Sequence, residues 1–184
     1  MKKLFATLIL MLPLVLFSQS TVNPDTVCYQ SATASTYSIP SVGTGTYTWT
    51  VTAPGTITSG QGTNSISVNW SAAAPGLITN GVSVSFTSSA GCTASPVNLN
   101  VLIYQVIPTI TPIGPFCAGA PCVALTGTPA GGTWSGSGVS GNQFCPGTSN
   151  SLVTYTYTNG GCTFTATSGV TVSPTPILSP IQHN

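Results

Sequence analysis

Only a few side chains in this sequence could carry out chemistry. Beyond Lys2 and Lys3, the 184 residues contain one carboxylate, Asp25, one imidazole, His183, and six cysteines, with no arginine or glutamate. Hydrolysis by paired carboxylates needs two acids, and a nucleophilic serine or cysteine needs a base beside it. The composition therefore predicts a protein that is not an enzyme and that has no cofactor and no metal site.

The first twenty residues have the three parts of a secretory signal peptide. A basic start, Lys2 and Lys3, is followed by a mainly apolar run over residues 4–17 and by small polar residues at 18–20. The run is shorter than the about 20 apolar residues that a membrane-spanning helix needs, so a retained membrane anchor is the weaker alternative. We expect residues 1–20 to be removed and the mature chain to be extracellular or at the cell surface.

The lack of charge also limits the partners of the mature chain. Recognition of a nucleic-acid backbone needs clustered lysine or arginine, and attraction to anionic lipid needs a polybasic segment. Tight calcium sites need several carboxylate oxygens. After residue 3 the sequence has no lysine or arginine and a single carboxylate, so we expect no nucleic-acid partner and no membrane insertion.

The cysteines of an exported chain are expected to form disulfides, because compartments outside the cytoplasm are oxidising. Two stretches of the sequence each open with a cysteine and have a Gly-Cys pair near their last predicted strand. If these positions are equivalent, the predicted bonds are Cys28–Cys92, Cys117–Cys162 and, inside the second stretch, Cys122–Cys145. Zinc binding is the weaker interpretation, because the sequence has no Cys-x-x-Cys motif.

Alternation of apolar and polar residues with a period of two recurs along the chain. In the stretch 46–52, Tyr47, Trp49 and Val51 face one way and the threonines face the other. This pattern is typical of half-buried antiparallel strands, and no segment after residue 20 has the helical period of 3.6. The sequence therefore predicts an all-β protein built from antiparallel β-sandwiches.

Proline clusters divide the predicted strands into two blocks. Three prolines fall between residues 105 and 116 and three more between residues 173 and 180, and proline both stiffens a chain and cannot donate to a strand ladder. After the signal peptide we therefore expect two tandem domains, a linker and a tail: residues 21–106, 107–116 (linker), 117–173 and 174–184 (tail).

Aromatic side chains are the remaining candidates for ligand contact. Tyr155 and Tyr157 could stack on sugar rings while surface amides and hydroxyls bind the sugar hydroxyls. The three tryptophans lie in phase with apolar neighbours, so they are expected in the core instead; they are Trp49, Trp70 and Trp134.

Two longer stretches resemble a known family. The stretch "YTWTVTAPGTITSGQGTNSISVNWS", followed by "GVSVSFTSSAGCTASPVNLNVLI", resembles the PKD-like, immunoglobulin-type β-sandwich repeated in surface proteins of Bacteroidota that use type IX export. The stretch "GGTWSGSGV" and its surroundings are similar to shorter Ig-like repeats of the same proteins. The resemblance implies two non-catalytic, Ig-like extracellular domains that act as spacers, adhesins or filament units.

The resemblance also suggests a modification site. Asp25-Thr26-Val27 matches the Asp-Ser/Thr-apolar pattern for O-glycosylation of exported proteins in Bacteroidota, which makes Thr26 a candidate.

These observations together predict a non-catalytic surface module, a spacer, stalk or adhesin unit. Its partners are expected to be other surface-protein domains or the chain itself, because uncharged strand edges are poorly defended against association. The alternative is a module that binds extracellular glycans.

Overall fold

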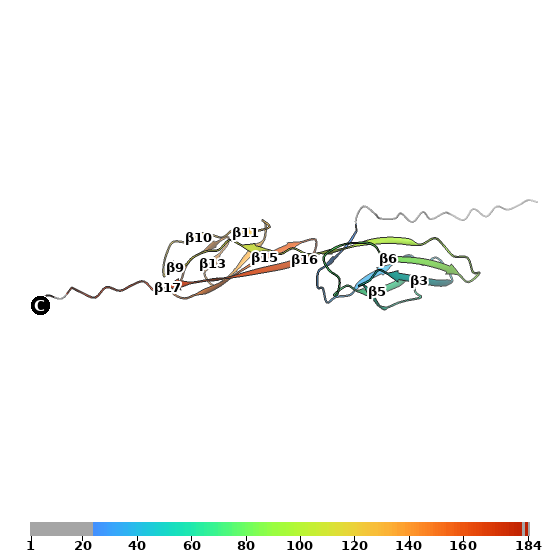
Figure 1. Ribbon diagram of the computed structural model, residues 1–184, viewed down its shortest axis with the longest axis horizontal. Helices are drawn as coiled ribbons and strands as arrows, with labels where there is room; N and C mark the ends of the chain where they lie inside the picture. Colours follow the sequence, from blue (N-terminus) through green and yellow to red (C-terminus); the bar gives the residue numbers. More distant parts are fainter. Residues whose placement is uncertain (1–23, 182, 184) are drawn as a thin grey trace, which may run out of the picture. The chain divides into compact units, whose positions relative to one another are not determined.

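The computed structural model describes residues 24–181 and residue 183. The expected signal peptide, residues 1–20, lies outside the described residues. The described chain is all-β, with seventeen strands and no helix (Figure 1), which confirms the fold class at that level. Within this part of the protein, no helix has the length and hydropathy needed to cross a bilayer.

The described residues divide into two compact units. The first unit comprises residues 24–25, 34–69 and 77–101, and the second comprises residues 26–33, 70–76 and 102 onwards. The boundaries differ from the expected 21–106 and 117–173, because two short segments before residue 102 group with the second unit. Residues 174–181, the expected tail, form no strand.

Part of the stretch expected to be a linker, 107–116, is built into the second unit. Thr109–Ile110 forms β8, which pairs antiparallel with β11 (Gly127–Thr128). Pro108 and Pro112 flank β8, and proline cannot donate a hydrogen bond to a neighbouring strand. The prolines therefore limit β8 to a short strand, but they do not remove the segment from the sheet.

Two sheets form the framework of the first unit, although residues 26–28 of β1 and 102–104 of β7 group with the second unit. The larger has the order β1-β7-β6-β3 and the smaller the order β2-β5-β4. The strands of the larger sheet are β1 (Asp25–Cys28), β7 (Val97–Tyr104), β6 (Gly76–Ser88) and β3 (Gly45–Val51). Those of the smaller sheet are β2 (Ser35–Ser38), β5 (Ser65–Asn69) and β4 (Thr56–Ser59).

Strand β3 shows the expected alternation. Tyr47 and Trp49 are buried, whereas the threonines at 46, 48 and 50 are exposed. Across the antiparallel pair with β6, Trp49 lies opposite Val84 and Tyr47 opposite Phe86, and the Tyr47 and Phe86 ring centroids are 4.8 Å apart. Cross-strand aromatic and β-branched pairs of this kind stabilise a sheet, so the apolar residues of β3 fix its register.

The outer edge of β3 is partly covered by a side chain. The Gln61 amide accepts a hydrogen bond from the Trp49 N–H at 3.1 Å and donates one to the Trp49 carbonyl at 2.9 Å. The Tyr47 N–H donates to the Gly62 carbonyl at 3.4 Å. Gln61 and Gly62 therefore satisfy backbone groups that an edge strand would otherwise leave open to another chain.

Short strands around one long hairpin make up the second unit. Its sheets have the orders β12-β15-β16, β10-β14-β13, β11-β8 and β17-β9. The long hairpin joins β15 (Ser151–Asn159) to β16 (Cys162–Val170), and the parallel pair joins β17 (Val172–Ser173) to β9 (Phe116–Cys117). The remaining strands are β10 (Val123–Ala124), β12 (Thr133–Gly136), β13 (Val139–Ser140) and β14 (Gln143–Phe144).

A compact apolar cluster holds these short strands together. Phe144 and Val153 are completely buried, and the Phe144 ring lies 5.8 Å from that of Phe116. The other buried members of the cluster are Leu125, Val170 and Val172, with Trp134 packed partly buried against them. Because most strands here have only two residues, we infer that side-chain packing contributes more than ladder hydrogen bonds to the stability of this unit.

Tyr155 anchors the segment between β11 and β12. Its hydroxyl accepts a hydrogen bond from the Gly132 N–H at 2.8 Å and donates one to the Pro129 carbonyl. A Cβ atom added at Gly132 would lie 2.5 Å from both the Tyr155 ring and the Thr156 carbonyl oxygen. Only glycine leaves enough space for the backbone to pass this close to the ring.

Replacing Gly132 with alanine is expected to lower the free energy of unfolding by about 1–3 kcal/mol, the usual cost of overpacking. Gly169→Ala is the matched control on β16, because a Cβ there meets nothing within 4 Å, and its effect should stay within about 0.5 kcal/mol. Urea denaturation followed by tryptophan fluorescence measures both variants. Equal midpoints would contradict the close approach of Gly132 to Tyr155.

Candidate functional site

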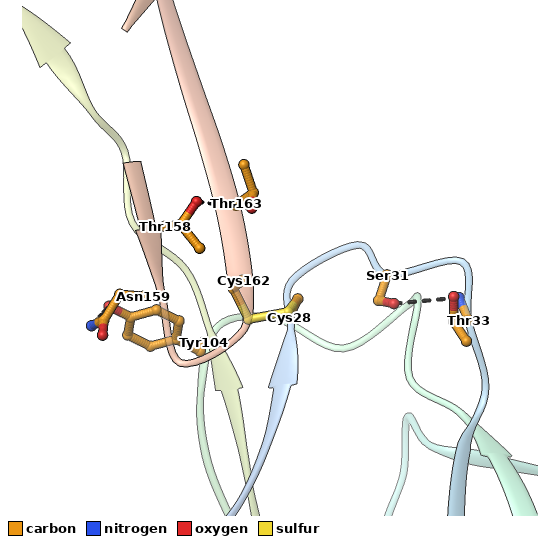
Figure 2. The surroundings of a disulfide bond; sticks show 8 residues. All are labelled: Cys28, Ser31, Thr33, Tyr104, Thr158, Asn159, Cys162 and Thr163. Carbon is orange, nitrogen blue, oxygen red and sulfur yellow. Dashed lines mark hydrogen bonds between the residues drawn. A yellow bond between two sulfur atoms is a disulfide. The ribbon is translucent and has the colours of Figure 1, made fainter. Parts of the chain in front are cut away.

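Two disulfides lie in the second unit. Cys28 is bonded to Cys162, with a Cα–Cα distance of 5.4 Å (Figure 2). Cys122 is bonded to Cys145, with a Cα–Cα distance of 4.1 Å, which is the third pair expected from the sequence. The antiparallel register of β10 and β14 sets Val123 opposite Phe144, so the cysteines beside these two residues lie next to each other.

The other two expected bonds are corrected by the structure. Cys117 is the last residue of β9 and lies beside Ser173, whereas Cys162 begins β16. β16 alone spans about 26 Å at 3.3 Å per residue, and bonded cysteines need Cα atoms within about 7 Å. The Cys117–Cys162 pair therefore cannot form inside the second unit.

The expected Cys28–Cys92 pair is wrong for a similar reason. The N–H of Tyr29, the residue after Cys28, donates to the carbonyl of Tyr104 at 2.9 Å, which places Cys28 at the end of β7. Cys92 lies in the turn that leads into the start of β7 at Val97. Cys92 and Cys117 are both exposed and not bonded.

Polar contacts surround the Cys28–Cys162 bond. Cys162 follows the turn of the β15–β16 hairpin, and the hydroxyls of Thr158 and Thr163 on either side of the turn are 3.1 Å apart. The Asn159 amide donates to the Tyr104 hydroxyl at 2.8 Å. Figure 2 shows these side chains around the bond. Sequence reasoning did not single out Thr158, Asn159 or Thr163, although Gly-Cys-Thr occurs at both 91–93 and 161–163.

The two candidate tyrosines have different environments. Tyr155 is 2% exposed, and its ring lies 4.5 Å from the Trp134 ring, so the expectation that it is a surface ligand contact is wrong. Burial follows from its phase, because Tyr155 faces the same side of β15 as the buried Val153. Tyr157, nearer the end of the strand, is half-buried and stays a prediction as a ligand contact.

Replacing Tyr155 with phenylalanine is expected to lower the free energy of unfolding by about 1–3 kcal/mol, because the half-buried Gly132 N–H and Pro129 carbonyl each lose a hydrogen bond worth about 0.5–1.5 kcal/mol. The control is Tyr157→Phe on the same strand, which should change stability by less than about 0.5 kcal/mol. Thermal or urea denaturation compares the two. A neutral Tyr155→Phe would show that the hydroxyl is not needed to hold the segment between β11 and β12.

Shallow hollows large enough for a small polar group occur in both units. The hollow in the second unit measures about 250 Å³ and is lined in part by Trp134, Asn142 and Gly131. The hollow in the first unit measures about 190 Å³, with Tyr37, Trp49 and Asn98 among its lining residues. Trp134 is half-buried and Asn142 is exposed, so the second hollow places an aromatic side chain beside an amide.

The few titratable and modifiable side chains are dispersed. The Asp25 carboxylate accepts a hydrogen bond from the Tyr37 hydroxyl at 2.8 Å. Thr26 is exposed on β1, which leaves its hydroxyl accessible, and its glycosylation stays a prediction. His183 is exposed in the C-terminal segment. Among the described residues, no three histidine, cysteine or acidic side chains come together in a group that could hold a metal ion.

A comparison with family models bears on the first unit. Residues 16–101 match the model of the PKD-like domain family. This part of the chain is similar to PKD-like domains. The match ends at Val101, which is also the last residue of the first unit. No curated protein matches the chain.

Comparison with solved structures finds multidomain proteins of low similarity. Extracellular domains 3–5 of Drosophila OTK align at 14% identity and a TM-score of 0.39, over 83% of this chain and 60% of that chain. The titin domains Z1Z2 in complex with telethonin align at 14% identity and a TM-score of 0.30, over 84% of this chain and 96% of that one.

Proposed function

We propose that this protein is a non-catalytic extracellular or cell-surface module, a spacer, stalk or adhesin unit. In this proposal the chain is exported by its signal peptide and its two units act as tandem Ig-like and PKD-like β-sandwich domains. Its partners are other surface-protein domains or further copies of itself. The PKD-like match over residues 16–101 supports the proposal, as do the disulfides, which persist in oxidising compartments.

The observation that carries this proposal is the hydrogen bond and partial burial of Asp25, the only carboxylate side chain in the sequence. Asp25 is half-buried on β1 and holds the Tyr37 hydroxyl. No lysine, arginine or glutamate occurs after residue 3, so within residues 24–181 Asp25 has no basic side chain and no second acid as a partner. We therefore assign Asp25 a structural role and expect the chain to act through shape and hydrogen bonding.

Antibody labelling of intact cells that produce the full chain tests the proposed location. The result expected is equal labelling before and after permeabilisation, with the label sensitive to added protease. Labelling that appears only after permeabilisation would overturn a surface role.

Glycan binding is the second candidate function, and the hollow beside Trp134 favours it. The half-buried Trp134 side chain next to the exposed Asn142 amide combines an aromatic contact for a sugar ring with a hydrogen-bond donor and acceptor for its hydroxyls. A glycan array with the secreted chain separates the two functions. A spacer gives no saturable signal, whereas a glycan-binding module that uses this hollow gives one that Asn142→Ala removes.

A further inference from the structure

The Cys28–Cys162 bond joins two kinds of position that each occur twice in the chain. Cys28 ends strand β1, and we refer to a cysteine in this setting as a strand-end cysteine. Cys162 directly follows a glycine turn between two strands, and we refer to it as a turn cysteine. The two unbonded cysteines fall into the same two classes: Cys117 is a strand-end cysteine and Cys92 is a turn cysteine.

The two strand-end cysteines have matching backbone surroundings. The N–H of the next residue donates to the last residue of a neighbouring strand, from Tyr29 to Tyr104 at 2.9 Å and from Ala118 to Ser173 at 2.8 Å. In both cases the N–H three residues on returns to the cysteine carbonyl at 3.1 Å.

The turns that follow these strand-end cysteines also match. Each has a left-handed residue at its third position, Gln30 with φ 56° and Gly119 with φ 74°. A positive φ at this position is characteristic of a type II turn. The chain therefore turns in the same way after Cys28 and after Cys117, and each cysteine lies at the start of the same kind of turn.

The two turn cysteines match as well. Each follows a glycine with positive φ, Gly161 at 78° and Gly91 at 83°. Each is followed by a threonine whose hydroxyl contacts a threonine across the turn, at 3.1 Å for Thr163 and 3.0 Å for Thr93. The turn before Cys92 is one residue longer, and the isolated bridge between Thr87 and Thr93 takes the place of the ladder pair between Thr158 and Thr163.

We propose that Cys117 of one copy of this chain forms a disulfide with Cys92 of a second copy. The Cys28–Cys162 bond shows that a strand-end cysteine and a turn cysteine with these surroundings meet the geometric requirements of a disulfide. The chain has one free cysteine of each class, both exposed, so a second copy supplies the complementary partner at either site. This inference deepens the proposed function and rests on it for the oxidising compartment.

The two sites give the assembly a direction. Cys92 belongs to the first unit and Cys117 to the second, so the contact joins different surfaces of the two copies. Heterologous contacts of this kind build open chains when the rotation between copies does not close a ring. The expected product is a covalent head-to-tail series of copies.

The bond forms by thiol–disulfide exchange with a low-molecular-weight disulfide as oxidant. The Cys92 thiolate attacks one sulfur of the oxidant and forms a mixed disulfide. The S–S bond of the oxidant breaks in this step, and its other half leaves as a small thiol after taking up a proton. The Cys117 thiolate of the second copy then attacks the Cys92 sulfur, and the second small thiol leaves with the electron pair and takes up a proton. In total, two protein thiols are oxidised and one small disulfide is reduced to two thiols.

Two single variants of the full secreted chain test the pairing. Cys92→Ser retains only the strand-end thiol and Cys117→Ser only the turn thiol. Each variant, and an equal mixture of both, is incubated with oxidised and reduced glutathione and analysed on a non-reducing gel with peptide mapping. Random pairing would give twice as much cross-dimer as either homodimer, whereas complementary sites are expected to give an about tenfold excess of cross-dimer.

The wild-type chain should give a ladder of oligomers that dithiothreitol collapses to monomer, and the Cys92→Ser/Cys117→Ser double variant should stay monomeric. Cross-dimer at the random proportion, or a wild-type monomer in which Cys92 is bonded to Cys117 of the same chain, would overturn the proposal. The gel tests disulfide pairing in purified protein, and antibody labelling of cells tests the surface location. A negative result on the gel would therefore overturn the pairing without contradicting the proposed location.

Discussion

Replacing Phe144 with alanine is expected to lower the free energy of unfolding of the second unit by about 3–5 kcal/mol, the usual cost of removing a buried phenylalanine ring. Phe144 is completely buried at the centre of the cluster that joins β14 to β15, β16 and β17. The space that the ring leaves is lined in part by Val153 and Val170, which the β15–β16 ladder holds in place. Urea denaturation followed by tryptophan fluorescence measures the loss.

The control for this variant is Leu152→Ala on β15, because Leu152 is 57% exposed. Its effect should stay within about 0.5 kcal/mol. If Phe144→Ala unfolds the second unit completely, hydrogen exchange on the first unit reports whether the loss is local. A Phe144→Ala variant as stable as the control would show that the cluster does not hold the unit together.

The second large effect is expected for Cys28→Ser. The Cys28–Cys162 bond joins residues 134 apart in the sequence, and its removal should cost about 2–5 kcal/mol, because it frees a long loop in the unfolded chain. Cys162→Ser should cost the same amount, and the double variant should cost no more than either single change, since all three break one bond. The difference in urea midpoint measures the effect.

Reductant provides the control for this experiment. With dithiothreitol present, wild type and Cys28→Ser both lack their disulfides and should unfold at the same urea concentration. If the midpoints already coincide without reductant, the Cys28–Cys162 bond does not stabilise the protein. If they differ equally in both conditions, the loss comes from packing at Cys28 and not from the bond.

Local pattern was sufficient to predict the strands. Tyr47 and Trp49 alternate with threonines in β3, and the structure buries the first set and exposes the second. This succeeds because the two faces of a strand are set by a backbone period that any short stretch of sequence contains. The same period, counted from Val153, would have placed Tyr155 in the core. Tyr155 was predicted to contact a ligand because it is aromatic, and its position in the alternation was not used.

The disulfide partners could not be predicted in this way. Sequence symmetry correctly marked Cys28 and Cys117 as equivalent positions, and Cys92 and Cys162 as another such pair. It did not show that Cys28 lies at the end of β7, whereas Cys92 lies before its start. The pairing of the cysteines depends on which strand ends meet in space, and a local sequence pattern does not contain that information. Gln61 escaped notice for the same reason, since it lies in the turn between β4 and β5 and its amide binds the backbone of Trp49 in β3.

The exposed threonines of β3 have a consequence for the conditions under which the protein works. Counterions screen attraction between exposed charges, and the screening length shrinks from about 10 Å at 0.1 M salt to about 3 Å at 1 M. Hydroxyl faces such as Thr46, Thr48 and Thr50 carry no charge to screen and none to titrate. Contacts made through such faces should therefore hold equally well in dilute water and in brine, and across a wide range of acidity.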